Sequence, residues 1–317
     1  MTIVPPSPGE PRRPDGPRDA GDAWVVSPSG EKYWGRFGAA GLLAVDAERG
    51  ILLQHRVSWS HFGGTWGLPG GALHEGEDAI AGALREAQEE AGIPDGAVRP
   101  RFTSVLDLGI WSYATVVSDV VVPFDPVISD PESVALAWVP LHEVDELPLH
   151  PGFGDAWPGL RARLDVRPAI VVDAANVVGS VPDGWWKDRV GAATRLRDRL
   201  LGLAVPAADL ALEGDVWFPA VSMVVEGQAR GVESASGVRG RARSGINAVD
   251  VVRADAGGDD TIVAEVTRRT AAGETVTVVT SDRRLRERVE AAGASQVRSA
   301  GWLVELLALR GRQRHDS

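Results

Sequence analysis

The sequence predicts an α/β protein of two domains, on three observations. The chain has 317 residues, about twice the length of a usual domain. Its first half combines short apolar runs with one long amphipathic helical pattern, whereas its second half alternates strand and helix patterns as parallel β-α-β units do. A new apolar run starts after Pro168, so we place the boundary near residue 166, with domains at residues 23–165 and 166–310.

The two ends of the chain are expected to lie outside these domains. Residues 1–22 are rich in proline and charge and have almost nothing to bury, which predicts a disordered tail, and residues 311–317 form a short C-terminal tail. No apolar run reaches the roughly 18 residues of a membrane helix, and the N-terminus lacks the apolar core of a signal peptide. We therefore expect a cytoplasmic protein without membrane contact. The excess of arginine over lysine, together with much alanine and glycine, suggests a bacterial source.

Charge and cysteine content narrow the chemistry. The 33 basic and 44 acidic residues give a net charge of −11, which repels polyanions unless a local basic patch or bound cations offset it. The chain has no cysteine, which excludes disulfides, thiolate ligands and cysteine nucleophiles. Aspartate, glutamate and histidine remain as candidate metal ligands.

The first domain reads as a β-rich unit with one central helix. In that helix the apolar side chains recur at the spacing of one buried helical face, namely Ile80, Ala83, Leu84, Ala87 and Ala91. Apolar runs predict strands at residues 37–45, 51–53, 102–106, 113–122 and 135–139, and further helices are expected near residues 141–147 and 152–164.

The polar face of the central helix carries three carboxylates. Glu86, Glu89 and Glu90 stand at offsets 0, 3 and 4, within about 100° of one another on the helix. Their mutual repulsion favours neutralisation by a divalent cation, and oxygen ligands select Mg²⁺ or Mn²⁺ shared with a phosphate group. Before the helix, Gly70 and Gly71 form a turn whose main chain can approach a ligand closely and supply a carbonyl.

These residues resemble a known family. Gly71, five residues, Glu77, seven residues and the run from Arg85 to Ile93 (REAQEEAGI) match every fixed position of the Nudix box. The resemblance covers about residues 34–164. It implies an α/β/α sandwich around a mixed sheet and metal-dependent hydrolysis of a nucleoside diphosphate linked to another moiety, that is, of a phosphoric anhydride bond.

The resemblance also implies roles for the matched residues. Glu86, Glu89 and Glu90 bind the metal, one of them helping to activate water, the Gly71 carbonyl completes the site, and Arg85 orients the glutamates. The box does not encode the substrate. Aromatic and cationic side chains outside it are candidates for substrate selection, with Arg56 and Trp66 foremost, followed by His61, Phe62, Trp111 and Tyr113.

The second domain reads as an alternating α/β unit. Strands are expected at residues 169–172, 216–225, 248–252 and 275–280, and helices at residues 186–203, 260–269, 282–291 and 300–309. The most loop-like stretch, residues 227–245, carries the densest basic cluster, made of Arg230, Arg239, Arg241 and Arg243. No internal repeat is evident.

Acidic residues in this domain stand at strand ends and helix starts. Asp173 follows the first strand, Asp259 and Asp260 open a helix, and Asp282 follows the strand at residues 275–280. Because ligands of parallel α/β sheets bind beyond the carboxyl ends of the strands, these carboxylates could converge, bind Mg²⁺ or Mn²⁺ and activate water for phosphodiester cleavage. Alternatively, each is an ordinary helix cap.

Three segments of this domain, residues 171–179, 258–266 and 276–294, resemble the NYN branch of the PIN-like nuclease superfamily. The resemblance implies a three-layer α/β domain with a mainly parallel sheet and an RNA substrate. It places Asp173, Asn176, one or both of Asp259 and Asp260, and Asp282 around the metal. The sequence departs from the pattern at Ala174 and Ala175, where relatives commonly have a glycine and an aromatic residue. Nearby side chains suited to a nucleic-acid strand are Trp185, Trp186, Lys187 and Arg189.

The sequence therefore predicts a Nudix-type hydrolase joined to a PIN-like domain that cleaves RNA. Two alternatives stay open. In one, the second domain is a non-catalytic nucleic-acid-binding or oligomerisation module. In the other, the first domain is a nucleotide sensor in a regulator. A homodimer is compatible with the sequence, which does not fix the oligomeric state.

Overall fold

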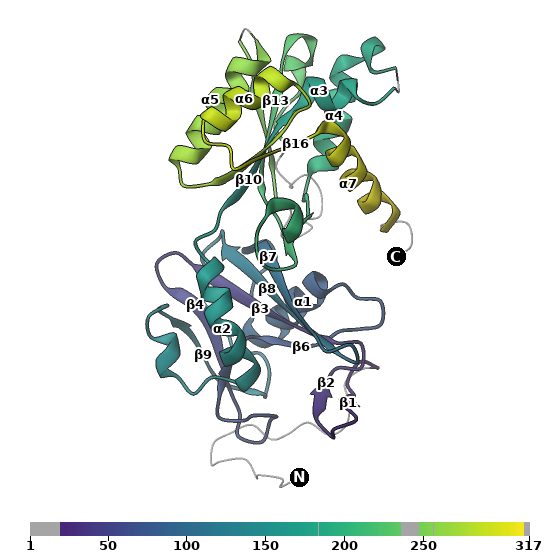
Figure 1. Ribbon diagram of the computed structural model, residues 1–317. Coiled ribbons are helices and arrows are strands. Elements are labelled where there is room, and N and C mark those ends of the chain that lie inside the picture. The colour runs from purple at the N-terminus through teal and green to yellow at the C-terminus, as the bar shows by residue number, and fades with distance from the viewer. Residues whose placement is uncertain (1–19, 183, 236–246, 256, 314–317) are drawn as a thin grey trace. The chain divides into compact units, whose positions relative to one another are not determined.

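The computed structural model describes residues 20–182, 184–235, 247–255 and 257–313 (Figure 1). The chain divides into two compact units between Leu164 and Asp165, and each unit is described by itself. Most of the tail expected at residues 1–22 lies outside the described residues, as do the basic residues Arg239, Arg241 and Arg243. None of the described helices is long and apolar enough to cross a membrane.

The first unit is built around a mixed sheet, as predicted. Its strands follow the order β7-β8-β3-β4-β5, with β6 paired to β3 and β9 paired to β4. The pairing of β3 with β8 is parallel, and the other pairings are antiparallel. The strands are β3 (Ala39–Asp46), β4 (Gly50–Arg56), β5 (Trp66–Gly67), β6 (Gly70–Ala72), β7 (Val98–Asp107), β8 (Ser112–Val120) and β9 (Ser133–Val139). A separate two-stranded ribbon joins β1 (Trp24–Val26) to β2 (Lys32–Trp34).

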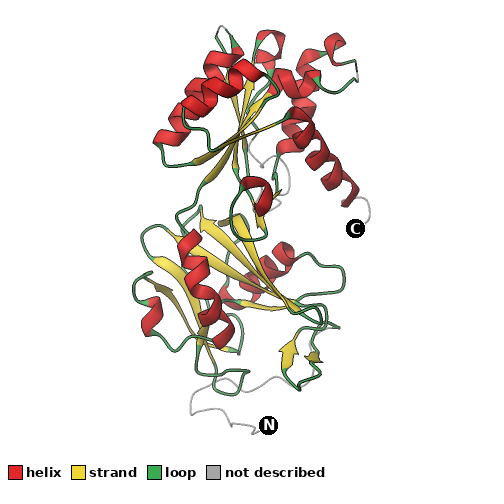
Figure 2. Cartoon of the chain, viewed as in Figure 1, coloured by secondary structure: helices red, strands yellow, loops and turns green. Residues whose placement is uncertain are grey.

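Two helices, α1 (Ala79–Ala91) and α2 (Pro151–Arg163), cover the faces of this sheet (Figures 1 and 2). Helix α1 begins where the Asp78 carboxylate accepts hydrogen bonds from two free backbone N–H groups, and it ends at Gly92 in the left-handed region with φ 64°. The predicted apolar stripe forms the contact with the sheet, because Ala83, Ala87 and Ala91 are fully buried in one cluster with strand residues. These small side chains allow the helix to lie close to the strands.

The differences from the predicted elements of the first unit are local. The short strands β1, β2, β5 and β6 were not expected, because segments of two or three residues carry no readable alternation. The helix expected near residues 141–147 is one 3₁₀ turn, η1 (Val144–Glu146). Residues 21 and 22, assigned to the tail, join the folded unit, since the Gly21 carbonyl accepts a hydrogen bond from the Arg36 N–H.

The second unit is a three-layer α/β structure with a parallel sheet. The strands follow the order β14-β13-β10-β15-β16, and every pairing is parallel. Their bounds are β10 (Pro168–Asp173), β13 (Ala220–Val225), β14 (Val249–Arg253), β15 (Thr275–Val279) and β16 (Gln296–Arg298). A short antiparallel pair, β11 (Val205–Pro206) and β12 (Val216–Trp217), stands apart from this sheet.

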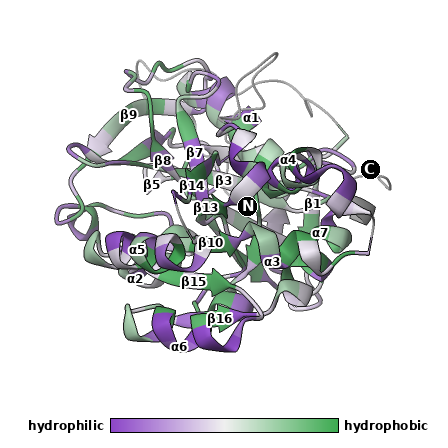
Figure 3. Ribbon diagram, turned by 90° about the horizontal axis from the view of Figure 1, so that it is seen from above, coloured by the Kyte–Doolittle hydropathy of each residue, from purple (hydrophilic) through white to green (hydrophobic). Residues whose placement is uncertain are grey.

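Helices cover both faces of the parallel sheet (Figures 1 and 3). One layer holds α5 (Gly258–Ala271) and α6 (Arg283–Ala291), and the other holds α3 (Ala174–Gly179), α4 (Arg189–Leu200) and α7 (Ala300–Gln313). Single 3₁₀ turns are η2 (Trp185–Lys187), η3 (Ala207–Leu210) and η4 (Gly227–Gly231). The central strand β10 is apolar and buried from Pro168 to Val172, as expected for a strand buried on both faces.

Three predicted elements of the second unit need correction. The strand expected at residues 216–225 is two strands, because Phe218 and Pro219 separate β12 from β13. The helix expected from residue 186 begins at Arg189, where Asp188 caps it by accepting from the Gly191 N–H. Residues 311–313, assigned to a tail, continue helix α7.

Candidate functional site

The glycine turn and the acidic face of α1 meet in the first unit. Gly71 lies on β6 and Glu86 on α1, and a Cβ atom placed on Gly71 would stand 2.6 Å from the Glu86 Cδ. Only glycine permits this approach of a carboxylate to the main chain. The neighbouring Gly70 N–H donates a 2.8 Å hydrogen bond to Oε2 of Glu90. The turn therefore holds two of the three predicted carboxylates.

Arg85 ties the carboxylates of this site together. Its Nε and Nη2 donate to the two oxygens of Glu77 at 2.9 and 2.8 Å, and Nη2 also donates to the Ala72 carbonyl. Its Nη1 donates to Oε1 of Glu86 at 2.7 Å. The paired guanidinium lowers the pKa of Glu77, and the hydrogen bonds to Glu77 raise the pKa of Arg85 itself. Arg85 thus holds Glu77 and Glu86 through the planar donors of its guanidinium group.

Burial sets the electrostatics of the carboxylates. Only 7% of Glu90 is exposed; burial, with the charges of Glu86 and Glu132, raises its pKa to about 8. Burial also raises the pKa of Glu86, against the opposing effect of Arg85. A buried carboxylate without a matching cation is unfavourable in its ionised form. With a pKa of about 8, Glu90 is mostly neutral near pH 7 without a cation, and a bound cation would favour its ionised form.

The third carboxylate stands apart from the other two. The Glu89 side chain is 60% exposed and approaches Arg85 at 3.4 Å. Among the described residues, no three acidic or histidine side chains are gathered as the ligands of one metal ion would be. The donor set nevertheless fits a hard divalent cation: its members are oxygens, Gly71 leaves its main chain open beside Glu86, and Glu90 is buried without a full counter-charge.

Two further carboxylates lie at this site, and the sequence did not single them out. Glu132 precedes β9, in a loop held against α1 by a hydrogen bond from the Ser129 N–H to the Glu90 carbonyl, and its charge raises the pKa of Glu90. Asp22, from the segment assigned to the tail, acts in the same way on Glu86. Neither residue belongs to a motif, because only the folding of distant segments brings them to α1.

The two foremost candidates for substrate binding lie in different surroundings. Arg56, at the end of β4, acts on Glu90 with its positive charge, and its Nε is buried without a hydrogen-bond partner. Trp66 on β5 instead stacks on His55, with ring centroids 4.7 Å apart and planes 12° from parallel.

An aromatic cluster adjoins Arg56. The centroid of the Phe62 ring lies 4.2 Å from the centroid of the His61 ring and 4.9 Å from that of the His150 ring. Burial, with the charges of Arg56 and His61, lowers the pKa of His150 to about 4, so the imidazole is neutral near pH 7. Phe62 adopts φ 55°, a left-handed conformation that is unfavourable for a bulky residue. Within this aromatic cluster, Phe62 therefore has a strained backbone conformation and a half-exposed ring. Tyr113 is partly buried and lies close enough to Glu90 for their charges to interact, whereas Trp111 stacks on Tyr33.

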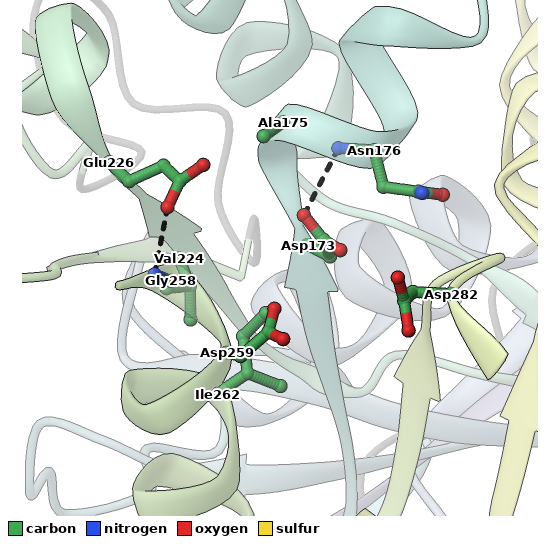
Figure 4. A pocket seen from close by; sticks show the side chains of 9 residues that line it. All are labelled: Asp173, Ala175, Asn176, Val224, Glu226, Gly258, Asp259, Ile262 and Asp282. Atoms are coloured by element: carbon green, nitrogen blue, oxygen red, sulfur yellow. Dashed lines mark hydrogen bonds between the residues drawn. The ribbon is translucent and has the colours of Figure 1, made fainter. Parts of the chain in front are cut away.

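In the second unit, three of the four predicted acids, Asp173, Asp259 and Asp282, line one cavity at the carboxyl ends of the strands (Figure 4). The cavity measures about 220 Å³. Its polar lining comes from the ends of β10, β13 and β15 and the starts of α3 and α5, namely Asp173, Asn176, Glu226, Asp259 and Asp282. Of the departures from the family pattern, Ala175 lines the cavity and Ala174 is buried.

Hydrogen bonds hold the centre of this cavity in place. The Asp173 carboxylate accepts from the Asn176 N–H and from the Thr280 hydroxyl, both at 3.0 Å. Oδ1 of Asn176 in turn accepts from the Ser281 N–H at 2.9 Å. Burial raises the pKa of Asp173, and the charges of Asp259 and Glu226 add to the effect. Asp173 and Asp282 also cap helices α3 and α6, so each of them both caps a helix and lines the cavity.

The two adjacent aspartates of α5 have different surroundings. Asp259 lines the cavity, whereas Asp260 is 81% exposed and pairs with Arg288 at 2.5 Å. Glu226, which the sequence did not single out, lies in the cavity directly after β13 and accepts from the Gly258 N–H at 2.8 Å. Its position after the buried run of β13 was the signal that would have identified it.

Comparisons with known proteins concern the first unit. The NUDIX domain family matches residues 35–158. A Mycobacterium tuberculosis protein named "Putative 8-oxo-dGTP diphosphatase 3" is 49% identical over 154 residues, which cover 45% of this chain and 70% of that protein. A Bifidobacterium longum protein named "Nucleoside triphosphate pyrophosphatase/Nudix hydrolase fusion protein" is 40% identical over 153 residues, covering 46% of this chain and 32% of that protein.

A similar chain is also known among solved structures. The crystal structure of a Nudix hydrolase from M. smegmatis, RenU, shares 44% sequence identity and covers 45% of this chain and 94% of its own, with a TM-score of 0.42.

Proposed function

The chain belongs to the Nudix family, and on that premise we propose that its first unit hydrolyses a phosphoric anhydride bond in a nucleoside diphosphate linked to another moiety. The sequence resemblance to this family is thereby confirmed. The observation that carries the proposal is the close approach of the Glu86 carboxylate to Gly71, with Arg85 holding Glu86 and with Glu90 buried beside it.

The residues of the site divide the work. Glu86, Glu89, Glu90 and the Gly71 carbonyl would hold a divalent cation, Mg²⁺ or Mn²⁺. When bound, such a cation polarises phosphoryl oxygens and lowers the pKa of a coordinated water. Arg85 keeps Glu86 in position, and the buried Glu90 is placed to accept a proton from water. Arg56 supplies positive charge for a phosphate on the same side of the site.

For the substrate, an oxidised guanine nucleotide such as 8-oxo-dGTP is the first candidate, because the M. tuberculosis relative carries that name. The half-exposed Phe62 ring offers a stacking surface for a purine, and the neutral His150 imidazole beside it can donate or accept a hydrogen bond. Trp66, stacked on His55, also holds His150, because its carbonyl accepts a 2.7 Å hydrogen bond from the His150 N–H.

A panel of substrates tests the proposal. Nucleoside triphosphates, 8-oxo-dGTP, ADP-ribose, dinucleoside polyphosphates and capped RNA are incubated with Mg²⁺ or Mn²⁺, and released phosphate or pyrophosphate is measured. Glu90→Gln and Glu89→Gln should abolish the turnover that the wild type shows, whereas Glu75→Gln, at an exposed carboxylate ahead of α1, should leave it unchanged. A wild-type protein inactive on the whole panel refutes the hydrolase and leaves the nucleotide-sensor alternative.

We further propose that the second unit is a PIN-like domain that cleaves RNA with a divalent cation. The observation in favour is the cavity in which Asp173, Asn176, Glu226, Asp259 and Asp282 meet at the carboxyl edge of a parallel sheet. Asp173 is the residue most suited to activate water, because it is partly buried, whereas Glu226, Asp259 and Asp282 are exposed. The exposed Trp186, with Arg189 above the Trp185 ring, offers a stacking surface for bases.

Matched variants separate this activity from the first. Asp173→Asn should remove RNA cleavage in Mg²⁺ or Mn²⁺ and leave nucleotide hydrolysis intact. Asp260→Asn is the control, because Asp260 points to Arg288 outside the cavity lining, and it should cleave normally. Wild-type protein that binds RNA without cleaving it identifies the second unit as a non-catalytic binding module.

A further inference from the structure

Helix α6 begins with three arginines at the rim of the cavity in the second unit. Asp282, which lines the cavity, caps the helix, and Arg283, Arg284 and Arg286 follow it. All three are exposed, whereas Leu285 and Val289 of the same helix are buried. We call Arg283, Arg284 and Arg286 the α6 arginine cluster. Figure 3 shows the hydrophilic colour along this helix.

Among the described residues, the α6 arginine cluster has no paired carboxylate. Within the part of the chain that the structure describes, its three side chains form no ion pair or hydrogen bond. In contrast, Arg288, one turn further along, pairs with Asp260 at 2.5 Å and lies 3.8 Å from Asp259. Positive charge in the first turn of a helix also opposes the helix dipole. The cluster therefore makes no contribution to the folded state that would explain it.

The position of Arg288 shows on which side of α6 the Arg284 side chain lies. Residues four apart lie on the same side of a helix, so Arg284 lies on the side from which Arg288 reaches Asp259, a lining residue of the cavity. Arg283 follows Asp282 directly. Arg286 stands four residues after Asp282, on the opposite side of α6 from Arg284, so the three arginines lie around the N-terminal end of α6 next to the cavity lining.

We propose that the α6 arginine cluster binds the phosphate backbone of a single-stranded nucleic acid next to the phosphodiester held in the cavity. This inference rests on the RNA-cleaving function proposed above. The cavity is lined by four carboxylates, and the chain has a net charge of −11, so a polyanion needs local cations to approach. Three unpaired guanidinium groups at the rim supply them, and each can bind a phosphate through two hydrogen bonds.

Salt-dependent binding tests the cluster. The probe is an oligouridine of about 12 nucleotides with a 5′-fluorescein label, a length within the range of single-strand binding sites. Its fluorescence anisotropy is measured in Mg²⁺ as full-length Asp173→Asn protein is added, because this variant should bind the probe without cleaving it. Each phosphate contact on a single strand contributes about 0.7 to the slope of log affinity against log salt. The triple variant Arg283→Gln, Arg284→Gln, Arg286→Gln should lower this slope by about 2 and weaken binding about 100-fold near 0.1 M salt.

Two further variants control for charge and fold. The corresponding triple lysine variant keeps the charge and should bind within a few-fold of the parent. Arg199→Gln removes an exposed arginine from α4, away from the cavity lining, and should weaken binding far less than Arg284→Gln does. In protein with Asp173 restored, the triple glutamine variant should raise the KM for RNA cleavage and leave kcat nearly unchanged.

The outcomes separate the cluster from the nuclease. If the triple glutamine variant binds like its parent, the cluster is refuted while cleavage by the wild type still stands. RNA binding that depends on the cluster, in a wild type that never cleaves, supports the cluster and refutes the nuclease. Wild-type protein that neither binds nor cleaves RNA overturns both.

Discussion

Replacement of Gly71 by alanine should separate activity from stability. The new Cβ would lie 2.6 Å from Cδ and Oε2 of Glu86, whereas ordinary contacts begin at 3.4 Å. The carboxylate must therefore retreat by about 0.8 Å, and a displacement near 1 Å of a reacting group costs about 100-fold in rate. We expect kcat for nucleotide hydrolysis to fall about 100-fold.

The same substitution should change stability little. Gly71 has no left-handed φ, so alanine is tolerated there and stabilises by about 0.4–1 kcal/mol through the unfolded chain. Weakening of the partly exposed Arg85–Glu86 pair costs a similar amount, about 0.5–1 kcal/mol. The free energy of unfolding of the first unit should therefore change by less than about 1 kcal/mol.

Two neighbouring glycines are matched controls. At Gly67, an added Cβ would meet the Cβ of His150 at 3.5 Å, an ordinary contact, so Gly67→Ala should leave both properties unchanged. At Gly70, it would stand 2.4 Å from the Ala40 carbonyl oxygen and 2.5 Å from the Gly41 Cα. These are backbone atoms of β3 that cannot yield alone, so Gly70→Ala should destabilise the unit by about 1–3 kcal/mol.

The kcat is measured from steady-state hydrolysis of 8-oxo-dGTP, or of another substrate of the panel if the wild type turns that one over instead. Hydrogen exchange of peptides from β3 and α1 gives the stability of the first unit separately from that of the second. Wild-type kcat in a folded Gly71→Ala protein would refute the role assigned to the Gly71–Glu86 approach. Unfolding by Gly71→Ala would refute the view that Glu86 is free to retreat.

Four further predictions concern the carboxylates and their partners. Glu132→Gln should lower kcat at least about tenfold at unchanged stability, and unchanged hydrolysis would remove Glu132 from the site. Arg85→Lys cannot reproduce the fork to two carboxylates and should lower kcat about tenfold or more; a variant with wild-type kcat would show that Arg85 acts only as a charge. In the second unit, the Arg269 side chain is 3% exposed and forms an ion pair with the buried Glu265 at 2.9 Å. Arg269→Met would leave the Glu265 carboxylate without this partner and should destabilise the second unit by about 3 kcal/mol, as measured by hydrogen exchange of peptides from β13. Burial alone would raise the pKa of Glu265, but its arginine and serine partners outweigh this and lower it from 4.5 to about 2. Because the pKa of Glu265 is lower in the folded state, ionised Glu265 stabilises the fold by about 3 kcal/mol above pH 4.5, and this stabilisation is lost as the pH falls toward 2. Glu265→Gln should flatten this pH dependence of the free energy of unfolding. An equally steep fall of stability in the variant would assign the pH dependence to other groups.

Much of the fold and of the first site was predictable because it depends on local spacing. The helical spacing of Ile80, Ala83 and Ala87 predicts the helix face that packs on the sheet, and the spacing of Glu86 and Glu90 predicts a separate carboxylate face. The ends of apolar strands identified Asp173 and Asp282 in the second unit in the same way, since parallel strands end at one edge of the sheet. These features need no knowledge of distant residues.

Other features depended on contacts between segments far apart in the chain. The sequence could not distinguish Asp259 from Asp260, because their roles depend on which side of α5 faces the cavity and on Arg288 from another helix. Likewise, Glu132 and Asp22 belong to no motif and reach α1 only through loop packing.

The sequence by itself therefore determined the chemistry available to this protein: two α/β units, an all-oxygen set of candidate ligands and the family of the first unit. Only the tertiary structure decided which carboxylates are buried and which are paired. It left Glu90 buried and Glu89 exposed, and it paired Asp260 but left the α6 arginine cluster unpaired. The reason is physical, because the cost of a charge depends on its exposure to water and on its distance from other charges, and long-range packing sets both.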